Sequence, residues 1–275
     1  MKIVYFGFNN LSSCLNLLLQ QEHEVVAIYT GENDSHCDQI YHLAEQYNVP
    51  VYESKPYKIQ LDQLIDDGVE CFISAEYAFK IELPENLKFS INIHPTMLPE
   101  GRGQTPIPLL ILSHPEFAGV TLHQITNKLD QGDILIQQKI ELDEQETFDT
   151  LAAKVFLLSP QLLLTVLDDI EHFFERATPQ GTGSVWPTVT TEQQTINWQS
   201  DIKAIEKQFK AFGTLGVKLI VDDVGYYTTS ANCMAFEHYY EAGDVISIDD
   251  YKVVLAAKGG FITIPKACLI VFDEI

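Results

Sequence analysis

Arginine is nearly absent from this 275-residue sequence. The chain carries 17 lysines and arginines against 39 aspartates and glutamates, which gives a net charge of −22. Only Arg102 and Arg176 are arginines. A protein that binds the backbone of a nucleic acid needs a clustered cationic face. The sequence contains no such cluster, and this disfavours DNA or tRNA as a partner.

Paired cysteines and closely spaced histidines are also missing. The five cysteines are scattered and odd in number, and none forms a CxxC pair: Cys14, Cys37, Cys71, Cys233 and Cys268. The eight histidines show no HxH or HxxxH spacing. These patterns predict reduced, mostly buried thiols rather than disulfides, and they do not suggest a zinc site.

Long hydrophobic runs are absent as well. No eighteen consecutive residues are apolar, so we expect no transmembrane helix and no membrane partner. The first ten residues, MKIVYFGFNN, enter a strand-like pattern and lack the features of a signal peptide. The sequence therefore predicts a cytoplasmic protein. An apolar content of 46% fits a globular chain with a substantial core.

The first two thirds of the sequence alternate between strand-like and helix-like segments. Apolar strand-like runs and helical patterns occur in turn at 2–7, 11–21, 23–30, 38–48, 49–54, 59–68, 69–75 and 89–95. This order is typical of a parallel sheet with helices on both faces, so we expect an α/β fold. Residues 118–142 should form a hairpin and 147–174 a long helix. Asn9 or Asn10 is expected to cap the first helix.

The last third of the sequence differs in character. Residues 177–199 include a small, polar stretch with glycine and proline, which predicts a linker. Residues 200–275 combine one helical pattern with short alternating strands, which predicts a small, mainly-β, barrel-like module. We therefore expect a Rossmann-like parallel-sheet domain at 1–176, a linker at 177–199 and a C-terminal module at 200–275.

A glycine turn follows the first strand, in the sequence FGFNN. The dinucleotide-binding fingerprint GxGxxG needs three glycines at such a turn, and only Gly7 is present. The sequence therefore gives little support for NAD or FAD. A backbone turn that lines a pocket at the end of the sheet is the better interpretation.

Asn92, His94 and Asp130 form the strongest candidate site. Asn92 and His94 lie two residues apart on a strand, so their side chains point the same way. Asp130 lies in the turn LDQGDI, where Gly132 can take a positive φ. A carboxylate near an imidazole raises the pKa of the imidazole and can hold it charged. An amide and an imidazolium aimed at one point suit the oxyanion of an acyl-transfer intermediate.

Other interpretations of these residues remain open from the pattern alone. An N-x-H sequence on a strand is often structural, and His123, on the alternating run 118–125, is interpreted as a structural histidine. His23, His36 and His42 are expected at the surface. A metal-dependent hydrolase that uses His94 and Asp130 is one alternative function, and a binding protein without catalysis is another.

Two stretches, INIHPTMLPEGRGQTPI and GVTLHQITNKLDQGDILIQQ, resemble the folate-dependent formyltransferase family. The matches follow the family in order and spacing: Asn92, His94, Met97-Leu98-Pro99, Arg102-Gly103, Pro106, Gly119-Val120-Thr121, His123, Asp130 and Gly132. The resemblance covers residues 1–165. It implies a Rossmann-like formyltransferase domain in which Asn92, His94 and Asp130 are catalytic.

The resemblance also implies the reaction and its co-substrate. A neutral amine would take the formyl group of N10-formyltetrahydrofolate, while Asn92 and protonated His94 hold the oxyanion and Asp130 keeps His94 charged. No metal is expected. The residues that would contact the folate are Ala78, Phe79, Lys80, Ile81, Leu83, Met97, Asn127, Lys128 and Leu129.

Three classes of acceptor amine are open. A nucleotide-linked amino sugar is favoured, because 23–34 and 185–198 resemble the amino-sugar branch of the family, which serves lipopolysaccharide O-antigen biosynthesis. Initiator methionyl-tRNA and another small amine are the alternatives. Arg102 could bind a phosphate through two hydrogen bonds, or anchor its own loop. The expected acceptor-binding residues are Phe8, Asn9, Asn10, Tyr77, Arg102, Gln104 and Thr105. A homodimer is a further family-based expectation.

Overall fold

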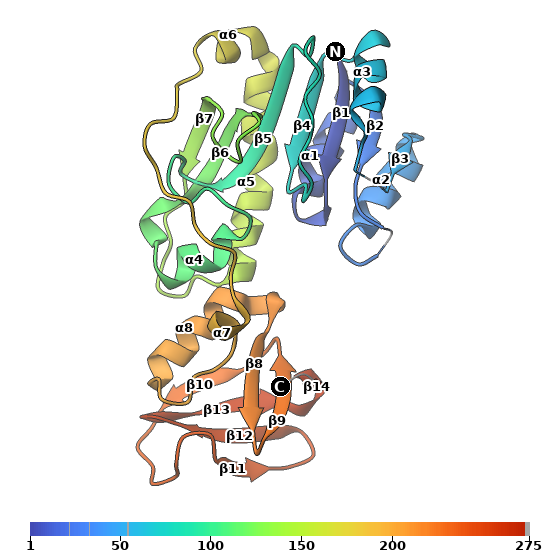
Figure 1. Cartoon of the computed structure of the whole chain (residues 1–275). Coiled ribbons are helices and arrows are strands. Elements are labelled where there is room, and N and C mark those ends of the chain that lie inside the picture. The colour runs from blue at the N-terminus through green and yellow to red at the C-terminus, as the bar shows by residue number, and fades with distance from the viewer. Residues whose placement is uncertain (22, 33, 54, 273–275) are drawn as a thin grey trace. The chain divides into compact units, whose positions relative to one another are not determined.

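The computed structural model describes residues 1–21, 23–32, 34–53 and 55–272. The chain separates into two compact units (Figure 1). The first consists of Met1–Pro106, Phe117–Glu141 and Ala152–Trp186, and the second of Ile107–Glu116, Leu142–Leu151 and Pro187–Ile275. The domain boundaries expected at 1–176, 177–199 and 200–275 remain a prediction.

A seven-stranded sheet, in the order β3-β2-β1-β4-β5-β6-β7, forms the centre of the first unit. Its strands are β1 (Lys2–Gly7), β2 (Glu24–Tyr29), β3 (Val51–Tyr52), β4 (Cys71–Ala75), β5 (Phe89–Thr96), β6 (Ala118–Gln124) and β7 (Ile134–Lys139). The first five strands pair in parallel, and β6 runs antiparallel to both of its neighbours. The structure thus confirms the α/β fold and the hairpin.

Helices cover both faces of this sheet. Leu61 packs with Phe6 and Phe72 on one face. On the other face, the hydroxyl of Tyr5 donates a 3.0 Å hydrogen bond to the carbonyl of Leu11, next to α1. The helices of this part of the chain are α1 (Ser12–Gln20), α2 (Asp38–Tyr47), α3 (Lys58–Asp66), α4 (Pro106–Leu112), α5 (Phe148–Asp168) and α6 (Ile170–Glu175).

Helix α5 is long and apolar enough to cross a membrane, judged by length and composition only. The core helix of a soluble protein passes the same test, so one such helix is weak evidence for a span. Leu151, Val155, Leu163 and Val166 of α5 are buried within the protein. This burial is what a core helix requires.

Asn9 has a different role from the one predicted. The residue before α1 is Leu11, and neither Asn9 nor Asn10 caps α1, so that expectation is wrong. The Oδ1 atom of Asn9 instead accepts hydrogen bonds from the backbone N–H groups of Gln39 (3.1 Å) and Ile40 (3.3 Å). Asn9 therefore satisfies the N-terminus of α2, a helix that is remote in sequence.

The second unit contains two antiparallel sheets, in the orders β14-β9-β8 and β10-β13-β12-β11. Asp201 caps α8, since its Oδ1 atom accepts a 2.9 Å hydrogen bond from the N–H of Ala204. This unit confirms a mainly-β C-terminal region. Its elements are α7 (Thr191–Gln194), α8 (Ile202–Phe212), β8 (Val217–Val221), β9 (Val224–Thr228), β10 (Asn232–Ala235), β11 (Val245–Ile248), β12 (Lys252–Ala257), β13 (Gly260–Pro265) and β14 (Leu269–Phe272).

Residues 178–186, within the expected linker, pair with the first unit. Thr178 exchanges two backbone hydrogen bonds with Ile134, of 2.8 and 2.9 Å. The backbone of Arg102 donates to the carbonyl of Ser184 (3.1 Å) and accepts from the N–H of Trp186 (2.8 Å). These hydrogen bonds join the segment to the first unit, which includes Ala152–Trp186.

Candidate active site

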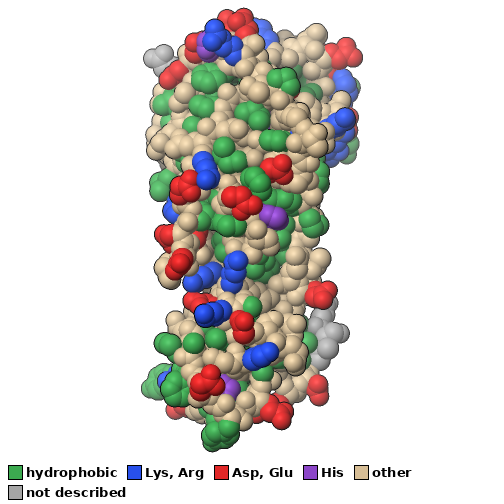
Figure 2. All heavy atoms as spheres, turned by 90° about the vertical axis from the view of Figure 1, so that its left-hand side faces the viewer, with side chains coloured by type: hydrophobic (Ala, Val, Ile, Leu, Met, Phe, Trp, Pro, Cys, Tyr) green, Lys and Arg blue, Asp and Glu red, His purple; other side chains and the backbone are tan. Residues whose placement is uncertain are grey.

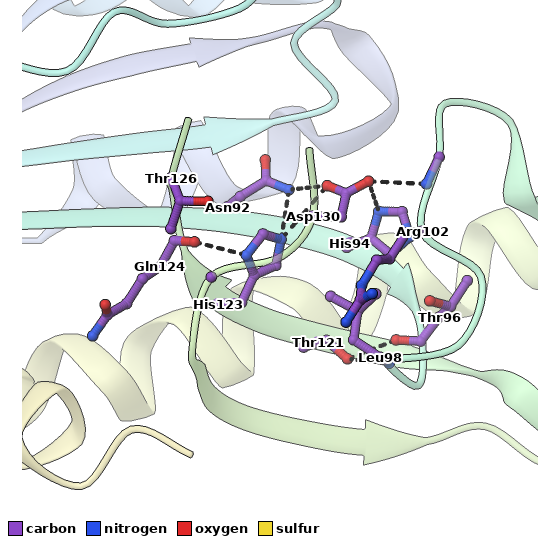
Figure 3. Close-up of polar contacts among 12 residues, drawn as sticks. Asn92, His94, Thr96, Leu98, Arg102, Thr121, His123, Gln124, Thr126 and Asp130 are labelled. Carbon is purple, nitrogen blue, oxygen red and sulfur yellow. Dashed lines mark hydrogen bonds and ion pairs between the residues drawn. The ribbon is translucent and has the colours of Figure 1, made fainter. Parts of the chain in front are cut away.

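Asn92, His94 and Asp130 meet at the carboxyl end of β5 (Figure 3). The Nδ2 atom of Asn92 donates a long, 3.4 Å hydrogen bond to Oδ1 of Asp130. The Nδ1 atom of His94 lies 3.7 Å from Oδ2 of Asp130. Asn92 and His94 come from one face of β5, and Asp130 comes from the turn between β6 and β7. The structure thus brings together the three residues singled out from the sequence.

The loop after β5 contacts both ionisable residues. The Nε2 atom of His94 lies 2.9 Å from the carbonyl oxygen of Gly101. Because a carbonyl only accepts hydrogen bonds, Nε2 carries the proton. The N–H of Gly103 donates to Oδ2 of Asp130 at 3.0 Å. Nδ1 is therefore the nitrogen of His94 that faces Asp130.

Burial lowers the pKa of His94 below its ordinary value. Loss of solvation is the largest effect, and Asp130 and the carbonyl of Gly101 raise the pKa by less. A lowered pKa favours the neutral imidazole, whose proton lies on Nε2. Burial opposes the expected effect of Asp130, and the expectation that Asp130 holds His94 charged stays a prediction.

Asp130 is held as a carboxylate. Burial raises the pKa of Asp130, but the neighbouring imidazoles of His123 and His94 and the N–H of Gly103 together lower it below its ordinary value. The backbone of Asp130 is left-handed, with a φ of 51°. Gly132, where the sequence predicted the positive φ, lies outside that region. A Cβ at Gly132 would instead lie 1.7 Å from the carbonyl oxygen of Gln124, so glycine permits a close approach there.

His123, interpreted from the sequence as a structural histidine, contacts the candidate site directly. Its Nδ1 atom lies 2.8 Å from the carbonyl oxygen of Gln124 and must donate, so Nε2 accepts from Nδ2 of Asn92 at 3.1 Å. Nε2 also lies 3.7 Å from Oδ1 of Asp130. His123 is 2% exposed, as a structural histidine would be, yet it orients Asn92 directly. Its position opposite Asn92 in the β5–β6 register is the signal that could have found it.

Of the residues expected to bind folate, Ile81 and Leu83 pack on the face of the sheet that carries Asn92. Asn92 pairs with Ser74 in the β4–β5 register, and Phe72, two residues earlier, points to the same face. Ile81 is buried against Phe72, so only its backbone is free to face a ligand. Leu83 is half-buried against the same cluster.

Several of the remaining folate candidates are exposed. Phe79 and Leu129 are large apolar side chains that are 44% and 59% exposed. The side chain of Met97 packs over Gly119, where a Cβ would lie 2.5 Å from its sulfur. The other exposed candidates are Ala78, Lys80, Asn127 and Lys128.

The acceptor candidates at the N-terminal turn lie among aromatic rings and amides. The ring of Tyr77 lies 5.4 Å from those of Phe6 and Phe79, and 6.0 Å from that of Phe8. Nδ2 of Asn10 donates to Oε1 of Glu76.

Glu76 was not singled out in the sequence. Its backbone is left-handed, with a φ of 65°. Burial raises its pKa, and the hydrogen bond from Asn10 only partly offsets this.

Three other acceptor candidates lie elsewhere. The side-chain amide of Asn9 accepts hydrogen bonds at the N-terminus of α2, while Gln104 is exposed and Thr105 is half-buried in the loop before α4.

Arg102 is buried and bound within the protein. Its Nε and Nη2 atoms donate to Oε1 of Gln180 at 3.0 and 2.9 Å, and Nη2 also donates to the carbonyl of Gly181 at 3.1 Å. Of the two alternatives for Arg102, these contacts favour the loop anchor over the phosphate ligand. Among the described residues, no group of three or more His, Cys, Asp or Glu side chains could hold a metal ion.

Comparison with known proteins adds independent information. The model of a family described as formyl transferase matches residues 1–167. A methionyl-tRNA formyltransferase of Ehrlichia canis is 36% identical over 187 residues, which span 62% of this chain and 62% of that protein. A methionyl-tRNA formyltransferase of Staphylococcus aureus is 26% identical over 276 residues, 94% of this chain and 88% of that protein.

A similar fold occurs in a solved structure. It is an N-formyltransferase from Helicobacter canadensis in complex with folinic acid and dTDP-3-aminofucose, with a TM-score of 0.67. The two chains are 18% identical, and the match covers 96% of this chain and 99% of that one. At this identity the likeness concerns the fold alone.

Proposed function

The chain belongs to the formyl transferase family, and on that premise we propose that it moves a formyl group from N10-formyltetrahydrofolate to a primary amine. The convergence of Asn92, His94 and Asp130 carries this proposal. The amide can donate a hydrogen bond to a developing oxyanion, and the carboxylate beside the imidazole can stabilise an imidazolium.

The amine attacks the formyl carbon as the neutral base. The carbonyl double bond opens, and the oxygen becomes an oxyanion that accepts a hydrogen bond from Nδ2 of Asn92. The 3.4 Å contact of this amide with Asp130 is long, so its hydrogen can turn to the incoming oxygen, while His123 keeps the other hydrogen in place. The bond from carbon to N10 then breaks, and the formyl group remains on the amine.

In this proposal His94 and Asp130 carry out the proton transfers. As negative charge develops on the formyl oxygen, the proton that the amine loses passes to Nδ1 of His94, beside Asp130. Asp130 stabilises the imidazolium. When the bond to N10 breaks, the same proton moves from His94 to N10 by way of Asp130 and a water molecule, and His94 is neutral again.

The described residues offer a suitable surface for the folate. Phe79 and Leu129 expose apolar side chains in the two expected folate segments. Backbone groups of 78–83 and 127–129 would hold the pterin, and Met97 would add an apolar wall. The complex of the Helicobacter canadensis enzyme with folinic acid supports this assignment.

The acceptor in our proposal is a nucleotide-linked amino sugar, in lipopolysaccharide O-antigen biosynthesis. The dTDP-3-aminofucose complex of the Helicobacter canadensis enzyme supports it. The net charge of −22 disfavours tRNA. On the face drawn in Figure 2, basic side chains are interspersed with acidic ones. Methionyl-tRNA is the alternative acceptor, because the Ehrlichia canis and Staphylococcus aureus relatives carry that name.

An acceptor panel tests this proposal. The chain is incubated with N10-formyltetrahydrofolate and, separately, dTDP-, UDP- and GDP-linked amino sugars, initiator methionyl-tRNA and small amines. Release of tetrahydrofolate together with a formylated nucleotide sugar is the expected result. Formylation of methionyl-tRNA alone would overturn the acceptor assignment. Folate binding without turnover on any amine would overturn the enzymatic proposal.

We also propose a cytoplasmic location, because all five cysteines are free, as in a reducing compartment. A homodimer remains an expectation from the family.

A further inference from the structure

We propose that Arg102 and Gln180 form a positioning pair that holds the catalytic loop and the Asp130 turn together. The inference rests on the proposed function, since it concerns the site that performs the transfer. In this role neither side chain touches the substrate, and the contacts of Arg102 within the protein take the place of the acceptor contact expected from the sequence. Both side chains act by positioning the catalytic residues.

Gln180 uses both ends of its side-chain amide. Its Nε2 atom donates to the carbonyls of Asp130 (3.0 Å) and Gly132 (2.7 Å), and its Oε1 atom accepts both hydrogen bonds from the Arg102 guanidinium. Gln180 therefore joins the 130–132 turn to the loop that carries Arg102. This loop and this turn are more than 25 residues apart in sequence.

The two connected segments both reach the catalytic groups. In the loop, the carbonyl of Gly101 accepts from His94, and the N–H of Gly103 donates to the carboxylate of Asp130. In the turn, the backbone of Asp130 has a left-handed φ of 51°, which an aspartate adopts only with support from its surroundings. The Arg102–Gln180 pair thus fixes the distance between the N–H of Gly103 and the carboxylate of Asp130.

The 178–186 segment is packed closely enough to enforce this arrangement. A Cβ at Gly103, whose φ is +134°, would lie 2.6 Å from the carbonyl oxygen of Trp186. A Cβ at Gly101 would lie 2.9 Å from the Trp186 ring. The N–H of Gly101 also donates to Oγ of Ser184 at 3.0 Å. Gln180 therefore lies on a segment that cannot shift independently of the loop 101–103.

The pair has a predictable effect on the Asp130 carboxyl. The N–H of Gly103 is one of the groups that lower the pKa of Asp130. Without Gln180, the loop and the turn separate and this hydrogen bond lengthens. The pKa of Asp130 then rises toward its ordinary value, although Gln180 makes no hydrogen bond to the Asp130 carboxylate and contacts only its backbone carbonyl.

The experiment is a 13C NMR titration of the Asp130 carboxyl carbon in the full chain, with the signal assigned by Asp130→Asn. In Gln180→Met, which keeps the length of the side chain and removes its hydrogen bonds, we expect a raised pKa. Gln180→Glu should have a similar effect, because it keeps an acceptor for Arg102 but loses the donor to the two carbonyls. Gln161→Met, on the exposed face of α5, is the matched control and should leave the titration unchanged.

Activity provides the second readout. Both Gln180 variants should lower kcat by about 10²-fold, as expected for displacement of a catalytic group by about 1 Å, with little change in KM for the folate. Arg102→Lys keeps the charge but not the forked contact, and should lower kcat in the same direction. An unchanged Asp130 titration in a folded Gln180→Met chain would overturn the proposal. Because that titration needs no turnover, it separates failure of this inference from failure of the proposed function.

Discussion

The substitution Gly132→Ala tests how closely the Asp130 turn is constrained. The added methyl group would lie 1.7 Å from the carbonyl oxygen of Gln124 and 2.6 Å from its carbon, both backbone atoms. Real Cβ atoms essentially never approach within 3.0 Å, so the turn must move by more than about 1 Å. That movement pulls Asp130 away from Asn92 and His94.

The expected loss of stability follows from this displacement. Overpacking costs about 1–3 kcal/mol. Each of the two hydrogen bonds from Gln180 to the turn contributes about 0.5–1.5 kcal/mol. We therefore expect the free energy of unfolding to fall by about 3 kcal/mol, and the rate of formyl transfer to fall by about 10²-fold.

Urea denaturation and the rate of tetrahydrofolate release measure the two effects. Gly181→Ala is the matched control for stability, because its Cβ would meet no described atom within 4 Å, and it should be neutral or slightly stabilising. A Gly132→Ala chain with the denaturation midpoint and the transfer rate of the original protein would refute this account of the turn.

Two further predictions concern the histidines. The pKa of His94 is lowered in the folded state, so as the pH falls the imidazole takes up a proton in the unfolded chain before it does so in the folded chain. The free energy of unfolding should therefore decrease as the pH drops below about 6.5, until the pH passes the folded-state pKa of His94. His94→Gln should remove that part of the slope of Tm against pH below about pH 6.5, and an unaltered slope would contradict the assignment. His123→Phe removes the acceptor of Asn92 and should lower kcat by up to about 10²-fold with KM for the folate preserved. Steady-state kinetics check this, and an unchanged kcat would show that Asn92 needs no such support.

Much of the fold and the core of the site followed from local patterns. Alternation along 89–95 placed Asn92 and His94 on one face of β5, and the hairpin over 118–142 brought Asp130 back to them. These predictions succeeded because period-2 alternation and turn residues are properties of neighbouring residues.

The parts that sequence could not supply depend on distant contacts. The segment around Gln180 is small and polar with no periodicity, so its hydrogen bonds to Arg102, 78 residues earlier, left no local signal. Asn9 caps α2 rather than the helix that follows it. The lowered pKa of His94 depends on burial, which outweighs Asp130 only once the surrounding chain is in place.

Transfer of a labelled formyl group tests the central claim most directly. N10-formyltetrahydrofolate carrying 13C in the formyl group is mixed with the chain and an acceptor amine, and NMR follows the label from folate to formamide. We predict transfer by the original chain and a rate about 10²–10³-fold lower in Asn92→Ala, with folate binding retained. Transfer by Asn92→Ala at the original rate would contradict the role of this site.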